Sequence, residues 1–415
     1  MAIFIQHCKE LLTPLFPGNG KIQRLKNASL IIEDNLISWV GSDHDCPSPE
    51  PGDQVIDGTN QILTPGLIDS HTHLVFAGDR SGEFIQRTQG ATYQQISASG
   101  GGIASTVTKT REASAYDLLR TARPRVNRWM EQGVTTLEIK SGYGLTTESE
   151  LKLLRVIRQL KKEVPIDISA TFLGAHDIPA EFKENRTDYI QKIITEMIPA
   201  VSAENLAEAV DVFCETGVYS ISESRLILES ALHHKLKIKV HADELSALGG
   251  ASLAAQLNGL SADHLLCITD QGINDLTNSE TVAILLPGTA WFLKMPYAPA
   301  RKLLDSGICV ALATDFNPGS CTIDQFSFIL MLAALYMNMT PDEILSAVTV
   351  NAAKALDRET ETGKLAPGYR ADLVLWNAPS WEHIIYHPTH NHAGKVFASG
   401  KLIYQSEIWN ECLFL

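Results

Sequence analysis

Two histidines, His71 and His73, end a short apolar segment that begins at the Pro65-Gly66 break. On a strand, residues i and i+2 point to the same face, so these imidazoles would lie side by side, whereas on a helix they would not. Two nitrogen donors at one strand end supply half of a site for zinc or iron. A His-x-His pair can also be no more than a polar strand end, so the remaining ligands have to come from elsewhere in the chain.

Later apolar segments also end on side chains that bind metals or move protons. These are His176, His241, His264 and Asp315. Any one of them could be an ordinary core or surface residue, but their joint occurrence at strand ends favours one mononuclear metal site with a position open for water. The predicted ligands of that site are His71, His73, His241 and Asp315.

Two neighbours of these ligands could handle protons. A metal lowers the pKa of bound water from about 16 to roughly 7, and His264 would orient or deprotonate that water. Glu244 follows His241 by three residues and would transfer a proton to the substrate. We therefore predict Glu244, His264 and the ligand Asp315 as the catalytic residues.

The central part of the chain, 65–364, alternates apolar strand-like runs with helical stretches. The strand candidates are 67–71, 134–140, 167–175, 209–214, 237–243, 261–266, 282–287 and 308–315. Capping-box patterns at Thr147–Glu150 and Ser220–Glu223 indicate helix starts between them. Eight strands alternating with helices predict a (β/α)₈ barrel of the TIM type, in which functional residues lie at the C-terminal strand ends.

Both ends of the chain have a different texture. Residues 1–64 and 365–415 contain short β-branched and apolar runs separated by turn signals, such as 28–32, 36–40 and 371–376. Neither segment is large enough to close a core alone. We expect the two ends to form one composite β-sandwich domain beside the barrel.

Composition limits the classes of partner and compartment. The 415-residue chain is 45% hydrophobic and 20% charged, with a net charge of −14, which argues against nucleic acid or an anionic membrane as the main partner. An anionic substrate would need a local basic residue. The chain has no apolar run of membrane-spanning length, no basic leader, and seven scattered cysteines without a CxxC pair, so we expect a cytoplasmic protein with reduced thiols.

Several loops carry a resemblance to a known family. The matching stretches are 76–84 (Phe-Ala-Gly-Asp-Arg-Ser-Gly-Glu-Phe), 100–103 (Gly-Gly-Gly-Ile), 138–144 (Glu-Ile-Lys-Ser-Gly-Tyr-Gly), 173–179 (Leu-Gly-Ala-His-Asp-Ile-Pro), 241–244 (His-Ala-Asp-Glu) and 313–320 (Ala-Thr-Asp-Phe-Asn-Pro-Gly-Ser). With the His-x-His pair they resemble the amidohydrolase superfamily and, within it, the imidazolonepropionases of histidine degradation.

The resemblance implies hydrolysis of the cyclic amide of 4-imidazolone-5-propanoate to N-formimidoyl-L-glutamate by a metal-activated water. It implies a zinc or iron ion on the four ligands above and substrate contacts from Arg80, Tyr143, His176, Glu244, Asn317, Gly319 and Ser320. Arg80 suits the substrate carboxylate, and Tyr143 and His176 could donate hydrogen bonds to the substrate. We also expect a homodimer.

One metal ion per chain is the expectation, because the fourth strand candidate ends Val212-Phe213-Cys214-Glu215, without the lysine that binuclear relatives carboxylate. Lys140 ends the second strand candidate, which we expect to be the wrong side of the barrel. Two alternatives remain: an aminohydrolase of a nucleobase-like ring, for which Arg80 would have no carboxylate partner, and a non-catalytic protein on the same fold.

Overall fold

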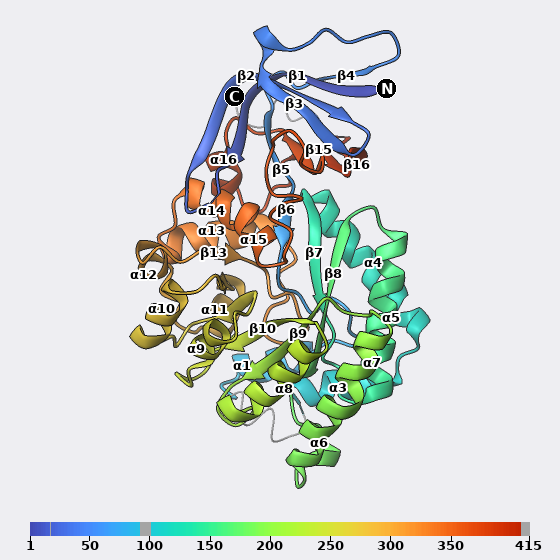
Figure 1. The fold of residues 1–415 in the computed structure, drawn as a ribbon, viewed down its shortest axis with the longest axis vertical. Coiled ribbons are helices and arrows are strands. Elements are labelled where there is room, and N and C mark those ends of the chain that lie inside the picture. The colour runs from blue at the N-terminus through green and yellow to red at the C-terminus, as the bar shows by residue number, and fades with distance from the viewer. Residues whose placement is uncertain (17, 92–100, 408–415) are drawn as a thin grey trace.

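The computed structural model describes residues 1–16, 18–91 and 101–407. Gly100 of the glycine cluster and residues 408–415 of the predicted sandwich domain therefore lie outside the described residues. The described chain forms two eight-stranded sheets. Figure 1 shows them as separate bodies, with a parallel barrel below and a mixed sheet at the end that carries the N-terminus.

The barrel sheet is parallel, and its strands follow one another in chain order. They are β6 (Leu67–Asp69), β7 (Val134–Lys140), β8 (Asp167–Ala175), β9 (Ala209–Cys214), β10 (Lys237–Ala242), β11 (Ser261–His264), β12 (Val282–Leu285) and β13 (Val310–Leu312). Nearly all of their residues are buried, as expected for parallel strands covered on both faces. The predicted TIM-type barrel is confirmed, with each strand within a few residues of its predicted range.

The barrel closes between its first and last strands just beyond their ends. The amide of Asp315 donates to the carbonyl of His71 (3.0 Å), and the amide of His73 donates to that of Phe316 (2.9 Å). This pairing, centred on the Thr72–Phe316 bridge, brings His71, His73 and Asp315 together. Barrel closure itself therefore positions three of the predicted ligands.

Helices surround the barrel strands (Figure 1). Their bounds are α1 (Ser81–Thr88), α3 (Ile103–Glu112), α4 (Ala115–Glu131), α5 (Thr147–Glu163), α6 (Arg186–Lys192), α7 (Ile198–Ala203), α8 (Ile221–His233), α9 (Gly250–Gln256), α10 (Asp270–Thr277), α11 (Pro287–Leu293), α12 (Ala300–Asp305), α13 (Phe326–Met337), α14 (Pro341–Ala347), α15 (Val350–Lys354) and α16 (Trp381–Tyr386).

The predicted helix starts have mixed outcomes. Helix α8 begins with the predicted Ser220–Glu223 capping box. The Thr147–Glu150 capping box is wrong, because Thr146 caps α5 and accepts from the amide of Ser149. Glu150 instead turns inward, where it accepts from loop amides at the barrel mouth.

The second sheet takes strands from both ends of the chain. They are β1 (Ala2–Pro14), β2 (Ile22–Glu33), β3 (Leu36–Ser42), β4 (Gln54–Asp57), β5 (Ile62–Pro65), β14 (Leu373–Trp376), β15 (Ala393–Ala398) and β16 (Lys401–Gln405). The long strand β1 pairs with β4 through its first half and with β5 through its second half, on either side of an irregularity between Ile5 and Cys8. Residues from both ends of the chain pack in one hydrophobic core. This shared core agrees with the predicted small sandwich.

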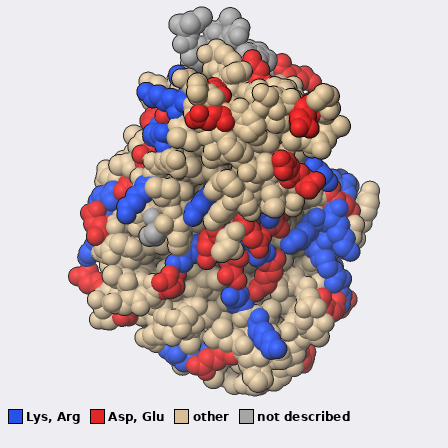
Figure 2. Space-filling model, turned by 45° about the horizontal axis from the view of Figure 1, so that its top comes forward, with Lys and Arg blue, Asp and Glu red and all other residues tan. Residues whose placement is uncertain are grey.

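The distribution of surface charge and the character of the helices are relevant to the predictions about nucleic acid and membranes. Figure 2 shows one face of the molecule, on which basic and acidic side chains are interspersed rather than gathered into a broad basic field. Of the helices in the described ranges, none combines the length and the apolar character needed to span a membrane.

Candidate active site

A cavity of about 600 Å³ opens at the C-terminal ends of the barrel strands. Its lining includes eleven of the residues predicted from the sequence: His73, Arg80, Tyr143, His176, His241, Glu244, His264, Asp315, Asn317, Gly319 and Ser320. The twelfth, His71, has no exposed surface and lies behind this lining. The tertiary fold thus gathers residues that are up to 249 positions apart in the chain, from His71 to Ser320.

The four predicted ligands converge through one atom each. Nε2 of His71 and Nε2 of His73 each lie 3.5 Å from Oδ1 of Asp315, and Nε2 of His241 lies 3.4 Å from Nε2 of His73. Zinc bonds of roughly 2.0–2.1 Å in tetrahedral geometry would separate neighbouring donor atoms by roughly 3.3–3.4 Å. The donor types and their spacing therefore fit a small metal ion such as zinc.

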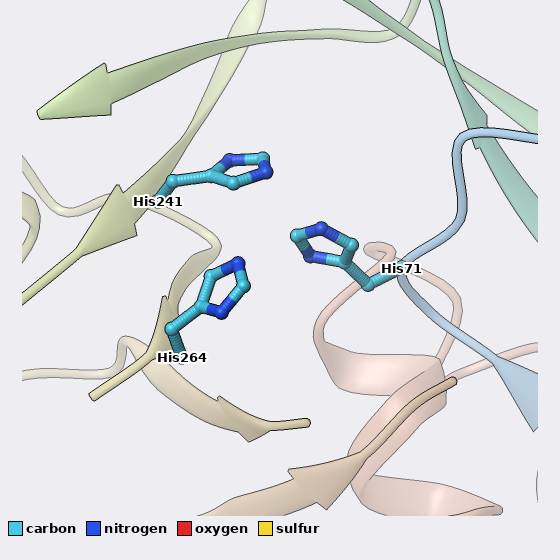
Figure 3. Close-up of side chains that lie close together, drawn as sticks. All are labelled: His71, His241 and His264. Carbon is cyan, nitrogen blue, oxygen red and sulfur yellow. The ribbon is translucent and has the colours of Figure 1, made fainter. Parts of the chain in front are cut away.

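A fifth donor lies beside these four. In the described residues, the possible ligand atoms form two groups within 4.8 Å, His71–His73–Asp315 and His71–His241–His264. Figure 3 shows the second group, with imidazoles pointing toward one another from the chain after β6, from β10 and from the end of β11. His71 belongs to both groups and is the common member of any ligand set built here.

Buried carboxylates hold two of the histidines from behind. Oδ2 of Asp263 lies 2.6 Å from Nδ1 of His71, and Oδ2 of Asp211 lies 3.0 Å from Nδ1 of His241. An occupied Nδ1 directs the opposite nitrogen, Nε2, at the cavity, which is the usual support of metal-binding histidines. Burial lowers the pKa of His71 well below its usual value, so its ring is neutral and able to bind a metal.

A hydrogen bond also fixes the orientation of the aspartate donor, Asp315. Oδ2 of Asp315 accepts a 2.5 Å hydrogen bond from the hydroxyl of Thr289, which leaves Oδ1 toward His71 and His73. Burial raises the pKa of Asp315 to about 7. A nearby cation would favour the ionised carboxylate and offset that burial cost.

Glu244 and His264 lie next to each other at the cavity wall. Nε2 of His264 is 3.6 Å from Oε2 of Glu244. Burial and the nearby Asp315 raise the pKa of Glu244 to about 8, and burial and His241 lower the pKa of His264 well below its usual value. At neutral pH the pair therefore combines a protonated carboxyl group with a neutral imidazole.

His176 faces the cavity as an acceptor. Its ring stacks on that of His73, with 5.1 Å between centroids, and its Nδ1 lies 2.9 Å from the carbonyl of Gly142. Because a carbonyl only accepts, Nδ1 carries the hydrogen and Nε2 has the lone pair. Burial and His241 lower the pKa of His176 to about 3, so the neutral ring can accept a hydrogen bond through Nε2, whereas the sequence suggested a donor.

Tyr143 is placed by the loop around it. Glu150, fully buried in the first turn of α5, accepts from the amides of Gly142 (3.0 Å), Gly144 (2.7 Å) and Leu145 (2.8 Å). The Tyr143 ring packs 5.3 Å from that of His176, centroid to centroid, and is almost completely buried. The hydroxyl-bearing ring is thus fixed between the loop and the histidine wall.

Arg80 occupies a tight position at the outer part of the cavity. Its Nε donates to Oε2 of Glu83 (2.8 Å), while Oε1 of Glu83 accepts from the amide of Gly102 (3.0 Å). The guanidinium lies against Gly319, where an added Cβ would come within 1.8 Å of Nη1. Glu83 thus fixes one edge of the guanidinium, and Gly319 leaves room for the rest.

Asn317 organises the turn that follows Asp315. Its side-chain amide donates to the carbonyl of Asp315 (2.7 Å) and to the hydroxyl of Ser320 (2.8 Å). Its Oδ1 accepts from the amides of Gly319 (2.8 Å) and Ser320 (2.7 Å). These bonds use both amide hydrogens and the oxygen, so the side chain shapes the turn rather than offering free groups to a ligand.

The sequence interpretation missed the buried charges that support the site: Glu138, Lys140, Asp211, Lys239 and Asp263. Lys140 ends the second barrel strand, as expected, and its side chain is buried in the barrel interior, with Nζ 2.8 Å from Oδ2 of Asp211. A usable signal existed, because charged residues interrupt apolar strands with a period of two, as in Glu138 and Lys140 or Lys239 and His241.

Residues 62–403 match the amidohydrolase family. The chain is 45% identical over 393 residues to the imidazolonepropionase of Shouchella clausii (strain KSM-K16), covering 94% of this chain and 88% of that protein. It is 43% identical over 416 residues to the imidazolonepropionase of Geobacillus sp. (strain WCH70), covering 97% and 98%. Among solved structures, a triazine hydrolase variant superposes with a TM-score of 0.79 at 17% identity, covering 97% of this chain and 95% of that one, which shows a common fold.

Proposed function

This chain belongs to the amidohydrolase family and, within it, to the imidazolonepropionases, and from that membership we propose how its residues carry out the reaction. It hydrolyses the cyclic amide of 4-imidazolone-5-propanoate to N-formimidoyl-L-glutamate, a step in the degradation of L-histidine to L-glutamate. The observation that supports these roles is the cavity, which is lined both by the guanidinium of Arg80 and by metal-donor residues.

Amidohydrolases bind a metal ion, and here we assign it to Nε2 of His71, His73 and His241 and Oδ1 of Asp315. His71, His73 and Asp315 form one group of converging donors, and Nε2 of His241 lies 3.4 Å from Nε2 of His73, which supports this set. We propose zinc or iron, one ion per chain. When bound, the metal activates a water molecule and polarises the ring carbonyl.

Substrate recognition is assigned to the cavity wall away from the donors. The Nη groups of Arg80, which form no hydrogen bond with the described residues, bind the propanoate carboxylate, because a guanidinium fork matches its two oxygens. Nε2 of His176 accepts from a ring N–H, and Tyr143 packs beside the ring. Gly319 and Ser320 form the floor under the carboxylate, in a turn shaped by Asn317.

The proton transfers are assigned to Glu244 and His264. Water oxygen adds to the ring carbonyl carbon, and His264 orients this water and takes a proton from it. As the ring C–N bond breaks, the protonated carboxyl group of Glu244 gives its proton to the departing nitrogen. The product carries a new carboxyl group and a formimidoyl N–H. Return of the proton from the His264 imidazolium to the neighbouring Glu244 carboxylate restores the starting pair, so atoms and charge balance.

The proposed function is tested with purified protein and 4-imidazolone-5-propanoate. We expect loss of the substrate's ultraviolet absorption and formation of one N-formimidoyl-L-glutamate for each substrate consumed. Release of ammonia from a purine or pyrimidine, with no turnover of the imidazolone, would instead favour the nucleobase alternative. Turnover of neither class would contradict an active enzyme.

Removing His71 should remove the metal. Because His71 is common to both donor groups, His71→Ala leaves too few ligands in either arrangement, and we expect occupancy below about a tenth of the wild-type value. Metal content per chain, measured by elemental analysis after gel filtration, provides the readout. His44→Ala, at an exposed surface histidine, is the matched control and should keep about one ion.

The same measurement separates the two possible ligand sets. His73→Asn should lose most of the metal, whereas His264→Asn should retain it, since His264 is assigned to the water and not to the metal. The opposite result, with metal kept in His73→Asn and lost in His264→Asn, would show that His264 is the ligand.

We propose that the enzyme is a homodimer that uses the exposed face of α13. This helix contains no charged residue, yet Leu335 and Tyr336 are 65% and 53% exposed. Tyr336 stacks on Tyr297, with 4.9 Å between centroids, and Phe328 packs against the half-exposed Trp291. Exposed apolar side chains gathered along one uncharged helix are typical of an interface, and a second copy supplies the same apolar side chains.

Leu335→Glu should dissociate this dimer, because a two-fold interface would bring two buried carboxylates together. We expect a monomer by sedimentation or light scattering at micromolar concentration, with wild type dimeric. Leu226→Glu, on α8 at 53% exposure, is the matched control and should remain dimeric. A Leu335→Glu protein of unchanged mass, or a monomeric wild type, would contradict the proposed interface.

The proposal also includes the domain boundaries and the cellular location. We place the domain boundaries at 1–64 plus 365–415 for the sandwich and 65–364 for the barrel, supported by Leu365 in the sandwich core. We also propose a cytoplasmic location, supported by cysteines without a disulfide framework in the sequence.

A further inference from the structure

A fully buried group of charged side chains lies beneath the donor atoms, and the proposed reaction does not use it. Nζ of Lys140, at the end of β7, lies 2.7 Å from Oε1 of Glu138, 2.8 Å from Oδ2 of Asp211 and 3.8 Å from Oδ2 of Asp263. Lys140, Asp211 and Asp263 have no exposed surface. Charges this deeply buried are costly unless they are paired, so the arrangement demands an explanation.

The two aspartates contacted by Lys140 are the ones that support the ligands. Asp263 binds Nδ1 of His71 at 2.6 Å, and Asp211 lies 3.0 Å from Nδ1 of His241 while also accepting from the His241 amide at 3.1 Å. In the part of the chain that the structure describes, Lys140 is the cation with ion pairs to both carboxylates. A continuous chain of contacts therefore joins two histidines on different strands through a single ammonium group.

We propose that Lys140 is a positioning residue of the metal centre, which holds Asp211 and Asp263 in place and thereby fixes the ring orientations of His71 and His241. The inference rests on the proposed metal ligands. Without the ammonium, the buried carboxylates of Asp211 and Asp263 would repel each other at close range, and each would gain from turning away from its histidine. A carboxylated Lys140 is excluded by its surroundings, since an anionic carbamate would meet three carboxylates at close range.

The loss of charge and the loss of histidine orientation in a Lys140 variant predict opposite changes in metal affinity. Removing a buried cation makes the surroundings more negative, and Coulomb attraction alone would then bind a metal cation more tightly. Loss of histidine orientation would bind it more weakly, typically by about 10- to 100-fold for a partner one contact away from the ligands. The direction of the change in affinity therefore distinguishes a positioning role from a purely electrostatic one.

Lys140→Met is the direct test, with Lys152→Met as the control. Lys152 is a partly buried lysine of α5 that donates to the carbonyls of Arg111 (2.8 Å) and Ala113 (2.8 Å), outside the group of charges beneath the donor atoms. Zinc affinity would be measured by competition with a chromophoric chelator, and ligand geometry by the visible spectrum of the Co²⁺-substituted protein. We expect about 10- to 100-fold weaker binding and an altered spectrum for Lys140→Met, and neither change for Lys152→Met.

A charge-balanced variant keeps the test valid if Lys140→Met does not fold. Lys140→Met with Asp263→Asn removes one charge of each sign, and we expect it to bind zinc more weakly than Asp263→Asn alone, because Asp211 has still lost its cation. Equal affinities for these two variants would overturn the proposal, as would wild-type affinity and spectrum in Lys140→Met or equal weakening in Lys152→Met. A wild-type protein that binds no zinc or iron would overturn the metal site itself, and the role of Lys140 with it.

Discussion

Glu244→Gln is expected to lower kcat by about 10²–10⁴-fold, the usual contribution of a general acid or base. The carboxyl group of Glu244 is protonated at neutral pH because burial and Asp315 raise its pKa to about 8. Glutamine has the same shape and can donate a hydrogen bond, but it cannot give up a proton. We therefore expect KM and metal content close to those of wild type, and a defect confined to kcat.

The pH dependence gives this prediction a second readout. A proton donor with a pKa of about 8 is active below that pH and loses its proton above it, so kcat of the wild type should fall as the pH rises through about 8. This alkaline limb should be absent from Glu244→Gln. Glu229→Gln, at a surface glutamate of α8, is the control for charge removal. A Glu244→Gln enzyme that keeps more than about a tenth of wild-type kcat would remove Glu244 from the mechanism.

Arg80→Ala is expected to lower kcat/KM by roughly 30- to 1,000-fold, which corresponds to on the order of 2–4 kcal/mol for a charge-assisted pair in an enclosed site. Arg80→Lys keeps the charge but loses the planar fork, so its loss should be clear but smaller. The control is a substrate whose carboxylate is esterified. Wild type should have a low kcat/KM on this ester, and Arg80→Ala should change that value little. Equal losses of kcat/KM on both substrates would instead show that Arg80 has a structural role and would favour the nucleobase alternative.

Gly319→Ala disturbs the contact between Arg80 and Gly319 without changing Arg80 itself. An added Cβ would lie 1.8 Å from Nη1 and 2.4 Å from Cζ of Arg80, so the guanidinium has to move. Because the change leaves Glu244 and the metal donors in place, we expect KM to rise on the order of tenfold, about 1.4 kcal/mol, with kcat nearly unchanged. An unchanged KM would show that substrate binding does not need Arg80 at its observed position.

The strand pattern of the chain was enough to predict the barrel and several of the residues at its mouth, and the family resemblance added the rest of the cavity wall. Buried parallel strands are continuous apolar runs, and the polar residue that ends each run must lie at the mouth of the barrel. His71, His241 and Asp315 could be recognised in this way, since their placement depends on the local strand pattern. Helix caps were less certain, because Glu150 can satisfy either its own helix or a neighbouring loop, and the tertiary contacts decided for the loop.

The groups that support those residues became visible only in the folded barrel. Asp263 meets His71 across 192 positions of chain, and Lys140 reaches two aspartates on different strands, because the register of the barrel brings alternate side chains into one interior layer. The fit of Arg80 against Gly319 likewise depends on loops that follow the first and last barrel strands. Such pairings leave no trace in local periodicity, since the energy of a buried charge depends on partners that only the closed barrel brings near.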